Sequence, residues 1–81
     1  MPKVRRRNLP RALYAHLLER IQEREISSAQ LILLLQWLDT EPEVPEERWF
    51  KRFSGMTVCG EGELVKTFLR PDQAATGTEL P

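Results

Sequence analysis

The chain has very few of the side chains that build metal sites and disulfide-stabilised folds. Its 81 residues include one cysteine, Cys59, and one histidine, His16. A zinc site of three or four nitrogen and sulfur ligands cannot be formed from that set within one chain, and an internal disulfide is impossible. A domain this small in an oxidising compartment usually carries several cysteines. The sequence therefore predicts a cytoplasmic protein with no metal and no other cofactor.

The sequence also lacks a long apolar segment. Its longest apolar run, residues 31–35, is far shorter than the ~20 residues that a membrane-spanning helix requires. A basic run lies near the start, but polar Asn8 and then Pro10 follow it, where the apolar centre of an export signal would have to be. We therefore expect neither an export signal nor a membrane span.

Net charge is absent as well, because 12 basic residues balance 12 acidic ones. The two signs are nevertheless segregated along the chain: residues 26–47 contain no lysine or arginine, and basic segments lie on either side. This pattern has two interpretations. It is common on ordinary solvated surfaces, and it also suits a molecule that binds an anion with one part and a basic partner with another.

Two helices are predicted in the first half. The first begins near Asn8, a residue favoured at helix N-caps, and its apolar residues recur at helical spacing at positions 9, 13, 17 and 21. Ser27 and Gln30 have the spacing of a capping box, which predicts a second helix from there to about Leu38. That helix is apolar almost all round, as expected of a helix covered on more than one side.

Three strands are predicted in the second half, at residues 49–53, 56–59 and 64–69, separated by short glycine-containing segments of hairpin length. The predicted fold class is α+β, with two N-terminal helices followed by a three-stranded antiparallel β-meander. A single domain of residues 8–71 would carry a basic N-terminal arm, 1–7, and a polar C-terminal tail, 72–81. Within the tail, residues 78–80 could pair as an edge strand, with disorder as the alternative.

A histidine and two arginines spaced four residues apart lie on one stripe of the first helix: His16, Arg20 and Arg24. Two guanidinium groups can bind a phosphodiester, and histidine can serve as acid or base near neutral pH. Basic residues of the predicted strands would extend this surface, namely Lys51, Arg52 and Lys66. The alternative is an exposed polar ridge of helical ion pairs with Glu19 and Glu23.

The segment from His16 to Ser27, HLLERIQEREIS, resembles a helix common in the RelE/ParE-like toxin superfamily and its BrnT-like relatives, where it has the form His-x-x-x-Arg-x-x-x-Arg-Gly-Ile-Ser. This chain has Glu25 in place of the glycine. Members of that superfamily are typically ribonucleases or gyrase poisons that a partner antitoxin holds inactive. The resemblance implies a catalytic role for His16, phosphate binding by Arg20 and Arg24, and an antitoxin-like partner.

Two functions of different class follow, and the sequence leaves open whether the protein is an enzyme. The first is a small toxin-antitoxin-like protein that engages RNA through the helix stripe and the basic strands. The second is a non-catalytic module that binds a protein partner through an exposed sheet edge and an acidic loop containing Glu41, Glu43, Glu46 and Glu47.

Overall fold

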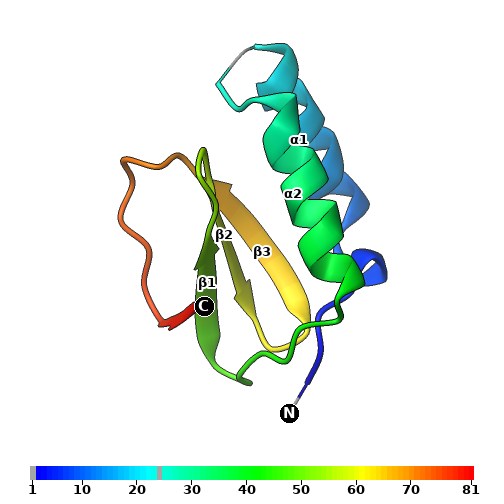
Figure 1. Cartoon of the computed structure of the whole chain (residues 1–81), viewed down its shortest axis with the longest axis vertical. Helices are drawn as coiled ribbons and strands as arrows, with labels where there is room; N and C mark the ends of the chain where they lie inside the picture. The colour runs from blue at the N-terminus through cyan, green and yellow to red at the C-terminus, as the bar shows by residue number, and fades with distance from the viewer. Residues whose placement is uncertain (1, 24) are drawn as a thin grey trace.

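The computed structural model describes residues 2–23 and 25–81. A short 3-10 turn, η1 (Arg6–Asn8), precedes two helices, α1 (Arg11–Gln22) and α2 (Ser28–Asp39). Four strands follow: β1 (Arg48–Arg52), β2 (Thr57–Glu61), β3 (Leu64–Leu69) and β4 (Thr78–Leu80). The α+β class and the helices-before-strands order are as predicted (Figure 1).

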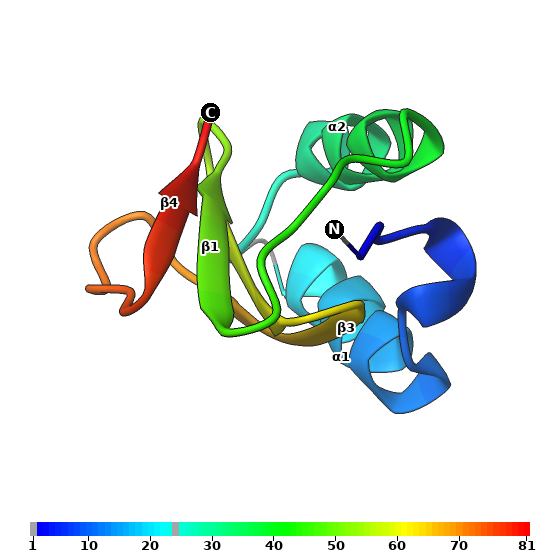
Figure 2. The same cartoon turned by 90° about the horizontal axis from the view of Figure 1, so that it is seen from below.

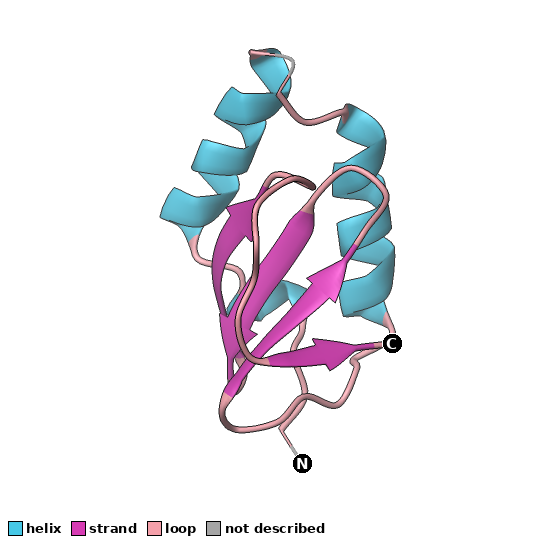
Figure 3. Ribbon diagram, turned by 90° about the vertical axis from the view of Figure 1, so that its left-hand side faces the viewer, coloured by secondary structure: helices cyan, strands magenta, loops and turns pink. Residues whose placement is uncertain are grey.

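The sheet differs from the predicted meander. It has four strands in the order β3-β2-β1-β4, and β4 pairs with β1 in parallel, so the sheet is mixed. The prediction of three purely antiparallel strands is therefore wrong, and the alternative that paired residues 78–80 as an edge strand is confirmed. Because β3 and β4 occupy opposite edges, residues 70–77 must cross the whole sheet, which Figure 3 shows.

Both helices lie on one face of the sheet, and the 70–77 segment lies on the other, here called the outer face (Figures 1 and 2). Trp49 of β1 faces the helices, since its ring centroid lies 5.8 Å from that of Trp37 on α2. The core between the layers includes Leu17, Leu34 and Phe68, all almost fully buried. Neither described helix is long and apolar enough to cross a membrane.

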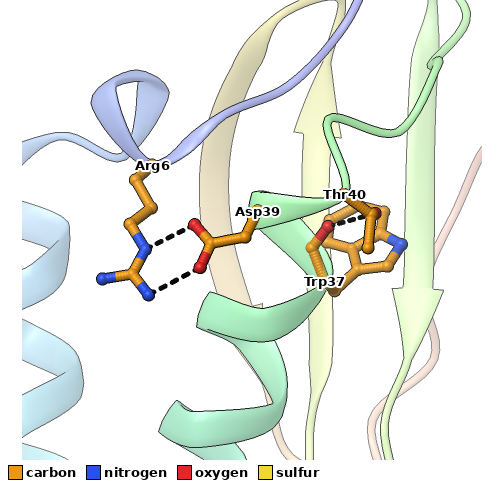
Figure 4. A network of polar contacts seen from close by, with 4 residues as sticks. All are labelled: Arg6, Trp37, Asp39 and Thr40. Carbon is orange, nitrogen blue, oxygen red and sulfur yellow. Dashed lines mark hydrogen bonds and ion pairs between the residues drawn. The ribbon is translucent and has the colours of Figure 1, made fainter.

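The basic arm at the start of the chain packs along the acidic segment that follows α2. Val4 is fully buried, and its N–H donates to the carbonyl of Pro42 at 3.1 Å. Arg6 forms a two-pronged ion pair with Asp39, with N···O distances of 2.7 and 2.8 Å (Figure 4). Arg5 forms a second ion pair, through its Nε, with Glu41. The segregated charges of the sequence thus meet within the fold.

The start of α1 differs from the predicted one, whereas α2 starts where the sequence predicted. Asn8 ends the 3-10 turn, where its Oδ1 accepts from the N–H of Arg5 at 2.8 Å, and α1 begins after Pro10. Ser27 caps α2 as predicted, because its Oγ accepts from the N–H of Ala29. Gln30 does not complete the capping box. It is 5% exposed, and its amide bonds to the turn between β1 and β2.

The solvent side of α2 is apolar and uncovered within the described chain. Ile32 is 57% exposed and Leu33 is 39% exposed, whereas the nearly all-apolar sequence predicted cover on more than one side. Of the apolar residues of α2, only Leu34 and Leu38 are fully buried, with no exposed surface. The helix therefore packs through one face.

Candidate functional site

Two of the predicted site residues, which are 50 positions apart in the sequence, line one groove. His16 is exposed on α1 and Lys66 is exposed on β3. A hollow of about 450 Å³ lies between these elements, and its wall also includes Leu13, Leu64 and Thr67. We call this the α1/β3 groove. It combines an imidazole, an ammonium group and a hydroxyl with an apolar floor, a set that can bind a phosphate and move a proton.

A β-bulge places Lys66 in the groove. In the register of β2 and β3, Cys59 pairs with Thr67 and Gly60 pairs with Val65, so Lys66 has no partner. The extra residue lets Val65 and Phe68, three positions apart, both face the core, whereas strict alternation would bury only one of them. Lys66 and Thr67 are both left exposed between them. Bulges of this kind commonly redirect side chains next to functional sites.

Arg20 has a structural contact of its own. Its Nη1 donates to the backbone carbonyl of Phe68 at 3.0 Å, which joins α1 to the edge strand β3. Arg20 also lines a small hollow together with Glu25 and Arg70. Arg24, the third member of the predicted stripe, lies outside the described residues.

The two predicted strand cations of β1 do not reach the α1/β3 groove. Lys51 Nζ donates to the carbonyl of Pro81 at 2.8 Å, beyond the end of β4. Arg52 lies over the ring of Phe50 at 5.5 Å and has Glu79 of β4 as an ion-pair partner at 4.0 Å. Both residues therefore help to hold β4 against β1, at the sheet edge opposite β3.

The predicted acidic surface is partly occupied. Glu41 pairs with Arg5, and Glu43 forms an isolated antiparallel β-bridge with Lys3. Glu46 and Glu47 are exposed, and neither has an ion-pair partner in the described chain. The N-terminal arm thus covers the first half of the acidic loop and leaves the second half open to solvent.

Sequence reasoning missed two residues near Lys66. Thr67 joins the groove only because of the bulge, and its signal was the three-residue spacing of Val65 and Phe68. Arg48, at the start of β1, lines a separate cavity on the outer face together with Lys66 and Cys59. Cys59 is half-buried, and burial raises the pKa of its thiol, which favours the protonated form. Among the described residues, no cluster of three metal-ligating side chains is present.

Comparisons with family models, curated proteins and solved structures gave no match to this chain.

Proposed function

We propose that the protein binds single-stranded RNA in the α1/β3 groove and cleaves it there, as a toxin-antitoxin-like ribonuclease would. The observation that carries the proposal is the convergence of His16 and Lys66 on one groove. Lys66 would bind the phosphodiester, and Thr67 would donate a hydrogen bond to a phosphate oxygen. The zero net charge of the chain does not prevent binding in the groove, because the strongest interaction of a bound phosphate is with the nearest cation, Lys66.

The chemistry that suits this set is transesterification within the RNA strand. The 2′ oxygen forms a bond to phosphorus, and the bond from phosphorus to the 5′ oxygen breaks, which leaves a 2′,3′-cyclic phosphate and a free 5′-hydroxyl. The net proton movement is from the 2′-hydroxyl to the departing 5′ oxygen. An imidazole can accept and return that proton, and His16 is the chain's one imidazole.

The alternative, a partner-binding module, draws less support from the same contacts. Glu41 is already paired with Arg5, and Arg20 donates a hydrogen bond to the backbone carbonyl of Phe68 on the edge strand β3. An incoming strand would have to displace Arg20 before it could pair with that edge. We therefore rank RNA engagement first and treat partner binding as the outcome if RNA binding fails.

Binding is tested by titrating a fluorescent oligouridylate at several salt concentrations. Each phosphate contact releases about one counterion from the RNA on binding. Lys66→Gln removes one such contact, so it should weaken binding and reduce the steepness of log affinity against log salt by about 0.7. Lys3→Gln is the matched control, since it removes one exposed lysine from the arm and should leave the slope unchanged. Equal slopes for Lys66→Gln and wild type, or no affinity at low salt, would remove the groove as an RNA site.

A further inference from the structure

A second hollow lies on the outer face of the sheet, beneath the segment of residues 70–77, which we call the strap. The strap connects β3 to β4 across this face (Figure 3). It encloses a cavity of about 440 Å³ against β1, β2 and β3. Two contacts shape its course: Gln73 Oε1 accepts from the N–H of Arg70 at 2.8 Å, and Gly77, with φ of 111°, runs so close to the carbonyl of Arg48 that a Cβ would not fit.

The cavity has unpaired positive charge on its wall. Arg48 and Lys66 both line it, and neither has an ion-pair partner in the described chain. One carboxylate, Glu61, also lines it, opposite Arg48 in the register of β1 and β2. The wall therefore keeps an excess of one positive charge. Thr67 and Thr76 add two hydroxyls that can donate or accept hydrogen bonds.

These groups suit different parts of one kind of ligand. A guanidinium and an ammonium bind phosphate oxygens, and a carboxylate beside them can accept hydrogen bonds from vicinal hydroxyls, as carboxylates do from ribose. Leu69, Ala74 and Ala75 give the remaining wall an apolar surface. The volume lies in the usual range for small-molecule sites.

We propose that the cavity beneath the strap binds a nucleoside monophosphate, with Arg48 and Lys66 on the phosphate and Glu61 on the ribose hydroxyls. The same chemistry occurs in a free nucleotide and in the terminal nucleotide of an RNA strand. The cavity adjoins the α1/β3 groove, but nucleotide binding in the cavity does not involve His16, which lines the groove alone. The cavity shares Lys66 and Thr67 with that groove, but Arg48 and Glu61 line only the cavity.

Cys59 supplies a built-in reporter of occupancy. It lines the cavity and is the chain's one cysteine, so a thiol reagent modifies a single, known position. The rate of alkylation by N-ethylmaleimide is measured with increasing uridine 5′-monophosphate. A bound nucleotide should slow the reaction in a saturable manner, and uridine, which lacks the phosphate, should protect far less.

Substitutions of the lining residues test which parts of the nucleotide they contact. Arg48→Gln should weaken protection by roughly tenfold or more, because a charge-assisted contact is lost, while Arg7→Gln, an exposed arginine of the 3-10 turn, should not. Glu61→Gln should reduce the preference for uridine 5′-monophosphate over its 2′,3′-dideoxy analogue. Isothermal titration calorimetry of the same proteins checks binding without the thiol.

Two further experiments distinguish nucleotide binding in the cavity from RNA cleavage in the groove, and a free nucleotide from the end of an RNA strand. His16→Ala should keep full protection by the nucleotide, so loss of cleavage and loss of cavity binding can be told apart. Protection by a 5′-phosphorylated oligouridylate but not by the free nucleotide would assign the cavity to an RNA end. No protection and no calorimetric signal with either probe, or unchanged protection in Arg48→Gln, would overturn the proposal.

Discussion

Gln30 is the residue whose role the structure changes most, and replacing it with alanine tests that role. Its Nε2 donates to Ser54 Oγ at 3.0 Å, and its Oε1 accepts from the N–H of Gly55 at 2.9 Å. These two bonds fasten the start of α2 to the turn between β1 and β2. A capping glutamine would instead act only within the helix.

The expected cost follows from these contacts. Each neutral hydrogen bond contributes about 0.5–1.5 kcal/mol to stability, and the loss of the bond leaves the Gly55 N–H without its acceptor. Alanine lacks the Cγ methylene of Gln30, whose burial contributes about 0.8 kcal/mol, and the better helix propensity of alanine offsets a few tenths of a kcal/mol. The free energy of unfolding should therefore fall by about 2–3 kcal/mol in Gln30→Ala.

Urea unfolding followed by circular dichroism and tryptophan fluorescence measures the difference. Gln36→Ala is the matched control, because it makes the same substitution at an exposed position of α2, and it should change stability by less than about 0.5 kcal/mol. A loss below about 0.5 kcal/mol in Gln30→Ala would refute the clamp between α2 and the β1–β2 turn.

Two further predictions concern packing and pH. Gly60→Ala should destabilise the fold by about 3 kcal/mol or more in urea melts, because the new Cβ would overlap the ring of Trp49, which is fully buried; a neutral effect would mean that the ring can move. Arg6 lowers the pKa of the Asp39 carboxyl, chiefly through their hydrogen bond, so the pair stabilises the fold above the unfolded-state pKa of aspartate and ceases to do so as pH falls through the lower folded-state value. Asp39→Asn should therefore be less stable than wild type at neutral pH, and the difference should shrink as pH falls through the folded-state pKa of Asp39; a difference that stays constant as pH falls would exclude the ion pair as the cause.

The sequence predicted the elements that depend on local patterns. The apolar spacing of α1, the Ser27 cap and the three predicted strands, β1 to β3, all correspond to elements in the structure, with bounds shifted by a few residues. Local periodicity was not enough for β4, because three residues between Gly77 and Pro81 become a strand only by pairing with β1, about 30 positions earlier in the chain. Gln30 illustrates the same limit, since its spacing from Ser27 fits a cap while its partners lie 24 and 25 residues away.

The candidate site was predictable only in part. The helix stripe identified His16, but basic residues of the strands looked equivalent in sequence. The sheet separates them, because Lys66 lies at the β3 edge beside α1, whereas Lys51 and Arg52 lie on β1 beside β4. Arg20 shows that a residue of the motif can also have a structural role, because its side chain bonds to the Phe68 carbonyl and joins α1 to β3. Which charges converge depends on strand order and on one bulge, and neither can be read from residue spacing.

Cleavage of a defined RNA tests the central proposal most directly. The substrate is a fluorescent oligodeoxynucleotide that contains one ribonucleotide, and its all-deoxy counterpart serves as the control because it lacks the 2′-hydroxyl nucleophile. Wild type should cut only the ribonucleotide substrate and leave a 2′,3′-cyclic phosphate. His16→Ala should bind it with unchanged affinity and fail to cut it. Cleavage by His16→Ala at the wild-type rate, or no cleavage by wild type at any RNA concentration that saturates binding, would contradict the account.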